Sequence, residues 1–243
     1  MKIYTYYHNL AESDDLEQQL IELWRVSWSR QGYTPIVLSL TDAQQHPYFE
    51  TLSTEMPRFF NQITNRTIAP YGMHCWYRWL AYATQPGDEK FYVSDYDVIN
   101  VKFPVTEPSD KLHLMDNACP CFASGTSRQF ANICNAFVDV SNERLDILKV
   151  RADHYHDQEF FKFNCRDDNA MKDRYNLLMT RDRTFLGPVD ADICHLAHAA
   201  VDWYVTEVDE YRVKNYDTLR GPEKHNIVQT VRIRVAKDLL NID

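Results

Sequence analysis

The sequence predicts an α/β fold, in which a mostly parallel central sheet is flanked by helices within a single domain, residues 1–243. Two observations support this prediction. Strand-like and helix-like segments alternate from the start: a strand at 2–7, a helical apolar period that ends at Gly32, and an almost uncharged strand at 34–40. Such a unit favours parallel pairing and a right-handed crossover. Hydrophobic residues, at 44%, are abundant enough for a sizeable core.

The elements of the first half follow from caps, periods and punctuation. Ser13 is a candidate cap of the first helix, and the acidic residues after it suit the positive end of the helix. Residues 41–70 are polar and contain three prolines, so short helices and loops are expected there. Residues 71–84 have a strong helical apolar period, with Arg78 on the face opposite the apolar one.

The second half continues the alternation with shorter segments. We expect a strand at 90–101 that breaks into polar residues, a strand at 111–116, a small and flexible stretch at 119–127, a helix at 128–140, a helix or turn at 155–163, extended segments at 184–189 and 192–197, and helices at 201–211 and 226–240. The helix at 226–240 repeats apolar residues every four positions, so it should pack on the body of the domain.

Charge and composition limit the partners. The chain has 26 basic and 35 acidic residues, a net charge of −9, which opposes general nucleic-acid binding. No run of about 18 apolar residues predicts a membrane span. The six cysteines, without an apolar leader segment, favour reduced thiols and a cytoplasmic location. Cys119 and Cys121 form a C-x-C pair with no second pair at zinc-ribbon spacing.

The most informative segment is the D-x-D sequence Asp95-Tyr96-Asp97, which directly follows the apolar residues 91–93. In α/β sheets ligands bind outside the carboxyl ends of the strands, and two carboxylates there can turn toward one point. Hard oxygen ligands suit Mg²⁺ or Mn²⁺, which can bridge the phosphates of a nucleotide. A solvated turn with two surface aspartates is the alternative.

Four further residues are candidates for the same site. His195 and His198, three residues apart, could each supply a nitrogen ligand; the alternative is a histidine satisfied by the backbone. Asp157-Gln158 precedes an aromatic pair, so Asp157 is a candidate general base or electrostatic stabiliser, or else a helix cap. Arg78 is a candidate for binding a phosphate or the Asp95–Asp97 turn, or else a surface arginine.

The order of these pieces resembles the GT-A superfamily of nucleotide-sugar-dependent glycosyltransferases, over roughly residues 2–203. The resemblance implies a Rossmann-like GT-A domain and a metal-dependent hexosyltransferase with Mn²⁺ or Mg²⁺. The donor would be a nucleotide-diphosphate sugar, with a UDP-sugar favoured. The acceptor stays open among a glycan, a lipid, a protein and a modified base.

The resemblance also assigns roles to individual residues. Asp95 and Tyr96 would contact the donor, and Asp97 would be the firmest metal ligand, with His195 or His198 completing the shell. The end of the first strand, Thr5, Tyr6 and Tyr7, would line the base. Asp157 and Gln158 would face the transferred sugar or the acceptor, and residues 123–127 would lie under the acceptor.

Several alternatives stay open at this level. The segment HLAHAAVDW leaves the choice between the two histidines undecided, and Asp157-Gln158 in place of an acidic pair favours a retaining enzyme. A nucleotidyltransferase is disfavoured because YYHNLAESDD lacks a glycine-rich phosphate loop. A non-catalytic cation- or nucleotide-binding α/β protein is the alternative from another class.

Overall fold

A computed structural model of the chain describes residues 1–9, 15–116, 119–151, 155–180, 186–187 and 191–242. Its centre is a six-stranded sheet in the order β2-β1-β3-β6-β5-β7. The strands are β1 (Lys2–Tyr6), β2 (Thr34–Leu38), β3 (Phe91–Ser94), β5 (Leu112–Asp116), β6 (Cys119–Gly125) and β7 (Leu177–Met179). β1 pairs in parallel with β2 and β3, and β5 with β7, whereas β6 is antiparallel to β3 and β5. The mostly parallel α/β sheet is therefore confirmed.

A second, smaller sheet begins with the strand that follows β3 in the chain. It has the order β4-β9-β8, formed by β4 (Val98–Asn100), β9 (Ile193–His195) and β8 (Leu186–Gly187). β4 and β9 are antiparallel, with Val98 opposite His195. This pairing brings a late segment of the chain next to the end of β3.

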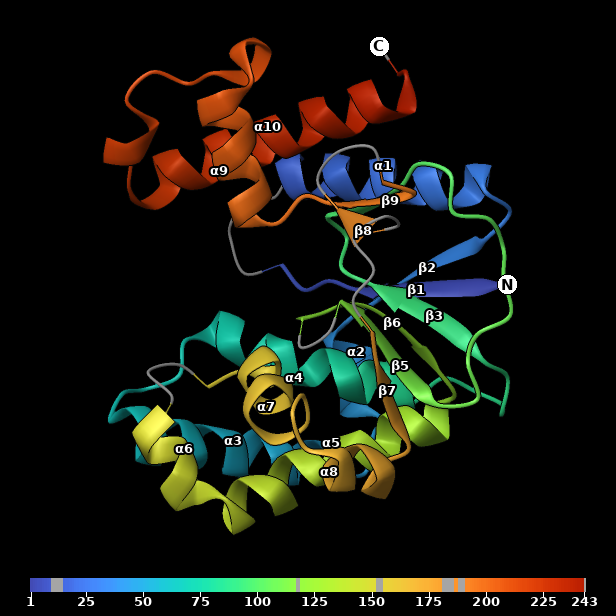
Figure 1. The fold of residues 1–243 in the computed structure, drawn as a ribbon, viewed down its shortest axis with the longest axis vertical. Helices are drawn as coiled ribbons and strands as arrows, with labels where there is room; N and C mark the ends of the chain where they lie inside the picture. Colours follow the sequence, from blue (N-terminus) through green and yellow to red (C-terminus); the bar gives the residue numbers. More distant parts are fainter. Residues whose placement is uncertain (10–14, 117–118, 152–154, 181–185, 188–190, 243) are drawn as a thin grey trace.

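Helices cover both faces of the central sheet (Figure 1). One face carries α1 (Asp15–Arg30), α9 (His198–Glu207) and α10 (Gly221–Leu240). The other carries α2 (Leu40–Gln44), α3 (Phe49–Thr64), α4 (Pro70–Ala83), α5 (Ser127–Glu143), α6 (Leu145–Arg151), α7 (Asp157–Asn164) and α8 (Asn169–Arg174). Two short 3-10 helices, η1 (Asp209–Tyr211) and η2 (Tyr216–Thr218), connect α9 to α10.

The alternation of side chains along the strands divides the apolar residues into two cores. Ile3 and Tyr92 face the α1 and α10 side, whereas Tyr4, Phe91 and Val93 face the side of α3, α4 and α5. The strands β1 and β3 are thus covered on both faces. Among the described residues, no helix has both the length and the apolar character needed to cross a membrane.

Local sequence explains where several helices begin. α1 has Asp15 and Glu17 in its first turn and Arg30 in its last, which complements the helix dipole. The predicted cap at Ser13 lies outside the described residues. α4 begins with Pro70 at a position where the missing N–H costs no hydrogen bond. Thr126 and Gln129 form a capping box that starts α5.

The expectation of short helices and loops at 41–70 is wrong in part, because α3 continues through Pro57. A proline inside a helix costs about 3 kcal/mol. The five buried apolar side chains of α3 each contribute roughly 1.5–3 kcal/mol, which outweighs that cost. They are Leu52, Met56, Phe59, Phe60 and Ile63.

The expectation of a flexible stretch at 119–127 is also wrong, because residues 119–125 form β6 in the middle of the sheet. Its small residues allow close packing: a side chain at Gly125 would come 3.1 Å from Leu112 Cδ1 and 3.4 Å from Phe130 Cε2. Gly125 pairs with Phe91, at the opposite end of β3 from Asp95. The structure therefore places Gly125 away from the D-x-D turn, whereas Ala123 pairs with Val93, two residues before Asp95.

Candidate metal and nucleotide site

The D-x-D turn is fixed by neighbours on three elements. The Asp95 N–H donates to the Cys121 carbonyl (2.8 Å), and the Val98 N–H donates to the Asp95 carbonyl (3.1 Å). From α1, the Trp24 indole donates to Ser94 Oγ at 2.8 Å, just before the turn. The chain therefore leaves the sheet at Asp95 in a defined direction, at the carboxyl end of β3.

Asp95, Asp97 and His195 converge on one point. Each offers one ligand atom, and these atoms all lie within 4.8 Å of one another. Asp97 Oδ1 lies 3.7 Å from His195 Nε2, farther than a hydrogen bond, and this buried oxygen has no hydrogen-bond partner among the described residues. His198 is exposed at the start of α9 and is not part of this cluster.

Each of the two carboxylates forms an ion pair with a different arginine. Arg78 of α4 forms an ion pair with Asp95 Oδ1. Arg232 of α10 places Nη2 3.0 Å from Asp97 Oδ2, and its Nε donates to the Leu196 carbonyl at 2.7 Å. Because α4 and α10 pack on opposite faces of the sheet, the two ion pairs orient the carboxylates from two sides.

Asp157 also binds Arg78 and so helps to fix its position. It is 2% exposed and follows the cap of α7. Its Oδ2 accepts hydrogen bonds from Arg78 Nε (2.9 Å), Arg78 Nη2 (2.5 Å) and the Trp79 indole (2.8 Å), while Oδ1 accepts the Gln158 N–H at 2.9 Å. The next side chain, that of Gln158, is exposed.

The electrostatics of the two site carboxyls differ. Burial raises the pKa of Asp95 to about 6, against the opposing effect of Arg78. Burial also disfavours ionisation of Asp97, but Arg232 and His195 outweigh it and hold the pKa of Asp97 below its usual value. Asp95, Asp97 and Asp157 face two guanidinium groups, those of Arg78 and Arg232, so one net negative charge remains to attract a cation.

The end of β1 lies beside the D-x-D turn, because β1 and β3 are parallel neighbours. Thr5 is fully buried, and its Oγ1 has no hydrogen-bond partner among the described residues. The Tyr6 hydroxyl is 2.8 Å from His74 Nδ1. The Tyr7 ring packs edge-on against Tyr96 at 5.7 Å between centroids. Aromatic side chains that follow β1 and β3 therefore meet at the carboxyl ends of these two strands.

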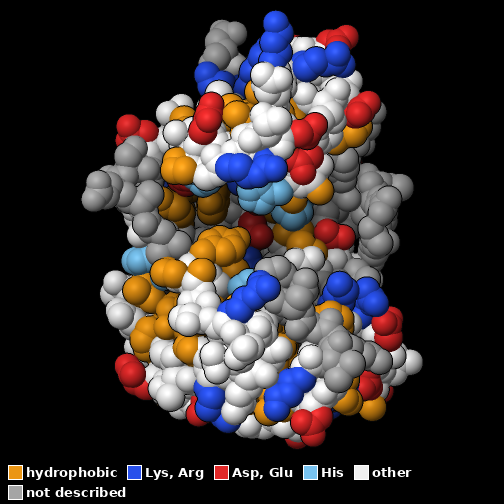
Figure 2. Space-filling view, turned by 90° about the vertical axis from the view of Figure 1, so that its left-hand side faces the viewer, with side chains coloured by type: hydrophobic (Ala, Val, Ile, Leu, Met, Phe, Trp, Pro, Cys, Tyr) orange, Lys and Arg blue, Asp and Glu red, His pale blue; other side chains and the backbone are white. Residues whose placement is uncertain are grey.

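The aromatic residues near the D-x-D segment divide into core and surface. Trp76 and Trp79 are buried, whereas Tyr71, at the start of α4, is 68% exposed. Tyr71 stands on the same helix as Arg78, which forms the ion pair with Asp95. Figure 2 shows a hollow across this part of the surface, with acidic, histidine and hydrophobic side chains around it.

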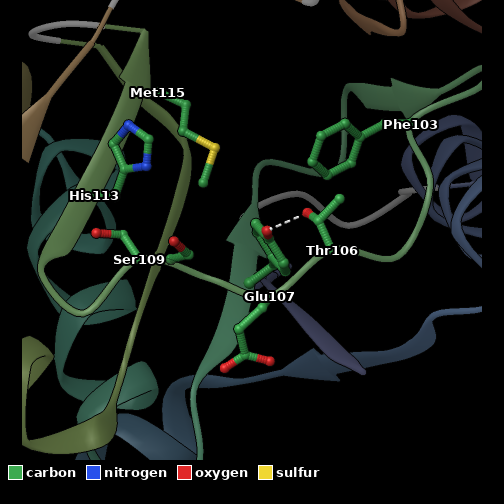
Figure 3. A pocket seen from close by; sticks show the side chains of 8 residues that line it. Phe103, Thr106, Glu107, Ser109, His113 and Met115 are labelled. Carbon is green, nitrogen blue, oxygen red and sulfur yellow. Dashed lines mark hydrogen bonds between the residues drawn. The ribbon is translucent and has the colours of Figure 1, made fainter.

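A separate pocket of about 270 Å³ lies under the segment that follows β4 (Figure 3). The Tyr92 hydroxyl and Thr106 Oγ1, 2.8 Å apart, form one side of it. Its other lining residues are Phe103, Glu107, Ser109, His113, Met115 and Ser124. Of the residues predicted for the site, Ser124, in the stretch expected under the acceptor, lines this pocket, whereas Asp95, Asp97 and His195 do not, so the ion cluster is a different place on the molecule.

Arg232 is a site residue that the sequence did not predict. Arg232 lies in a helix expected only to cover the core, yet it is buried and bound to Asp97. The sequence signal for its burial was helical spacing. Arg232 lies four residues after Val228 and three before Val235, so the three side chains share one buried face of the helix.

Comparisons with known proteins give weak likenesses. A family described as a domain of unknown function (DUF8765) matches residues 1–85, a minor part of the chain. No curated protein sequence matches. A solved glycosyltransferase involved in the glycosylation of the major capsid of PBCV-1 is 12% identical, with a TM-score of 0.47, covering 83% of this chain and 95% of that chain. The apo-form glycosyltransferase GlyE of Streptococcus pneumoniae TIGR4 is 11% identical, with a TM-score of 0.44, covering 98% of this chain and 62% of that chain.

Proposed function

We propose that this protein is a metal-dependent glycosyltransferase that moves a sugar from a nucleotide-diphosphate sugar to an acceptor. The observation that supports this most is the convergence of Asp95, Asp97 and His195 at the carboxyl end of β3. Two carboxylates and one imidazole are a donor set that suits Mn²⁺ or Mg²⁺. The unpartnered, buried Oδ1 of Asp97 fits such an ion, since a buried acceptor without a partner is costly.

In this proposal His195, rather than His198, is the nitrogen ligand. His195 is held by the β4–β9 pairing, and its neighbour Leu196 donates its N–H to the Asp97 carbonyl at 2.8 Å. The imidazole is therefore positioned by backbone hydrogen bonds on both strands. When bound, the ion neutralises the diphosphate and stabilises the charge that develops as the nucleotide leaves.

Arg78 and Arg232 orient the ligands. Each holds one oxygen of a carboxylate, which offsets part of the cost of burying that carboxylate before the ion arrives. Arg78 also lies near the surface that a donor phosphate would occupy, and a guanidinium group is well suited to a phosphate. Its ion pair with Asp157 sets the position from which it would act.

We assign Asp157 a positioning role in preference to that of a general base. Its carboxylate is 2% exposed and accepts hydrogen bonds from Arg78, Trp79 and the Gln158 backbone. A base must reach the proton that it removes, and a buried, fully engaged carboxylate is poorly placed for that. Gln158, exposed beside it, is the residue of the pair that can face a sugar. This arrangement supports retention of the anomeric configuration, which product NMR can measure.

The donor would lie at the carboxyl ends of β1 and β3, next to α4. Tyr6, Tyr7 and Tyr96 form an aromatic border for the base of a UDP-sugar, next to the buried Thr5. Tyr71 presents an exposed ring for the apolar face of a sugar.

A hydrolysis and transfer assay tests the function. Purified protein is incubated with a panel of nucleotide-diphosphate sugars, with and without Mn²⁺, and with glycan, lipid, protein and nucleoside acceptors. We expect Mn²⁺-dependent release of a nucleoside diphosphate, which Asp97→Asn abolishes. Asp173→Asn, on an exposed part of α8, is the matched control and should retain activity. Equal release by wild type and Asp97→Asn would overturn the proposal.

A second candidate is a cation-binding protein without transferase activity, because the cluster of Asp95, Asp97 and His195 suits a cation by itself, without a nucleotide. Thermal unfolding separates the two. A transferase should be stabilised by a nucleoside diphosphate only when Mn²⁺ is present. Stabilisation by Ca²⁺ alone, with no effect of nucleotide, would favour the second candidate.

A further inference from the structure

A second group of ligand-type side chains lies next to the two site carboxylates. It consists of Asp116, Cys119, Cys121 and His195, whose ligand atoms all lie within 4.8 Å of one another. Three of them come from the β5–β6 pair, and His195 comes from β9. The group contains two sulfur atoms, one imidazole and one carboxylate, so its chemistry differs from that of Asp95 and Asp97.

The strand pairing explains why these residues meet. Asp116 is opposite Cys119 in the antiparallel β5–β6 register. Cys119 and Cys121 are two positions apart on β6, so their side chains project from the same face. Cys121 Sγ lies 3.9 Å from Asp116 Oδ2. The carbonyl of Cys121 accepts the Asp95 N–H, which fixes this group against the D-x-D turn.

The four side chains match the ligand set and number of a tetrahedral zinc site. Zn²⁺ binds cysteine sulfur at about 2.3 Å and histidine nitrogen at about 2.0–2.1 Å, so its ligand atoms lie roughly 3.3–3.8 Å apart. The observed upper limit of 4.8 Å requires only small side-chain movements. Mn²⁺ and Mg²⁺ prefer oxygen ligands, so thiol sulfur atoms discriminate against them.

We propose that Asp116, Cys119, Cys121 and His195 bind Zn²⁺, at a site distinct in chemistry from the proposed hard-cation site. On binding, each thiol loses one proton to solvent and the thiolate sulfur coordinates the ion. The thiols are available for this, since none of the six cysteines forms a disulfide. The zinc site does not depend on the proposed transferase activity.

His195 belongs to both groups, and this links the two sites. Its Nε2 faces Asp97 Oδ1 at 3.7 Å. An imidazole that turns toward Cys119 and Cys121 can no longer complete the shell at Asp95 and Asp97. Zinc is therefore expected to weaken Mn²⁺ binding, and the effect should be competitive because a single side chain is shared.

Cobalt substitution tests the site directly. The metal-free protein is titrated with Co²⁺, whose absorption distinguishes tetrahedral thiolate coordination from an octahedral oxygen site. We expect one equivalent of Co²⁺ with thiolate charge-transfer bands, displaced by Zn²⁺. Cys119→Ser should weaken zinc binding by at least about tenfold, measured against a competing chelator. Cys119 is partly exposed, so this variant is expected to fold; circular dichroism checks it.

Two controls keep the result specific. Cys134→Ser, in α5 on the other core, removes a thiol away from the group and should leave the cobalt spectrum unchanged. Asp97→Asn should abolish nucleotide release but retain the thiolate bands, so the transferase and the zinc site can fail separately. An octahedral cobalt spectrum without thiolate bands, or unchanged zinc affinity in a folded Cys119→Ser variant, would overturn the zinc site.

Discussion

Arg232 places Nη2 3.0 Å from Oδ2 of Asp97, so the C-terminal helix α10 forms part of the site built at the end of β3. The arginine is 6% exposed and also donates to the Leu196 carbonyl. A buried carboxylate that loses its only arginine keeps an uncompensated charge. This relationship gives the first prediction.

Arg232→Met should destabilise the metal-free protein by about 3–5 kcal/mol, because Asp97, whose side chain is only 13% exposed, then lacks its arginine partner. Mn²⁺ should restore part of this loss, so the increase in melting temperature on adding Mn²⁺ is larger in the variant than in wild type. Arg234→Met is the matched control: Arg234 is exposed and lies 3.5 Å from Glu210, a surface pair worth roughly 0–1 kcal/mol. Equal effects of the two substitutions would contradict the prediction.

The coupling between Asp157 and Arg78 is the second prediction. If Asp157 acts through Arg78, the effects of Asp157→Asn and Arg78→Lys on the affinity for a nucleoside diphosphate with Mn²⁺ should not add. A double-mutant cycle, measured by calorimetry, should give a coupling energy of about 0.5–3 kcal/mol. Additive effects would instead indicate that Asp157 contacts the ligand itself. The pH profile of the rate should keep its shape in Asp157→Asn, since a positioning residue transfers no proton.

Tyr71 provides the third prediction. Because its ring is 68% exposed, Tyr71→Ala should leave the melting temperature almost unchanged. If the ring stacks on a sugar, Tyr71→Ala should raise the KM for donor or acceptor by roughly fivefold to tenfold, equivalent to about 1 kcal/mol. Tyr71→Phe keeps the ring and should stay close to wild type. A KM that rises equally in both variants would assign the effect to the hydroxyl.

Residue patterns predicted the strand end that holds the D-x-D segment, since apolar residues 91–93 are followed by polar ones in an alternating α/β chain. They could not select His195 over His198, because that choice depends on the β4–β9 register, which pairs Val98 with His195. The central strand β6 was missed for another reason. Its sequence, CPCFASG, combines a proline with small residues, and these resemble a loop unless the two neighbouring strands are known.

Arg232 and Cys119 illustrate the same limit for the site. A helix period identifies which face of α10 is buried, but it does not tell whether an arginine on that face meets a carboxylate from a distant strand. Likewise, C-x-C spacing gives only two of four ligands, and the others, Asp116 and His195, are brought in by the sheet. Contacts between elements far apart in sequence depend on packing, which local periodicity does not encode.

The fourth prediction concerns acid stability and His74. Burial, and then the neighbouring His8, lower the pKa of His74 to about 4, and the His8 and His74 rings are stacked 4.4 Å apart. Between pH 6.5, the ordinary pKa, and about 4, the unfolded chain therefore binds a proton at this residue that the folded chain does not. The free energy of unfolding must then fall as the pH is lowered through this window.

Urea unfolding at pH 7 and pH 5 measures the effect. His74→Gln removes the titrating group and keeps a polar side chain beside the Tyr6 hydroxyl, which lies 2.8 Å from His74 Nδ1 in the native protein. The difference in unfolding free energy between the two pH values should be smaller in His74→Gln than in wild type. Parallel pH dependences in the two proteins would mean that His74 takes up its proton equally well in the folded state, so that His8 and burial do not oppose it.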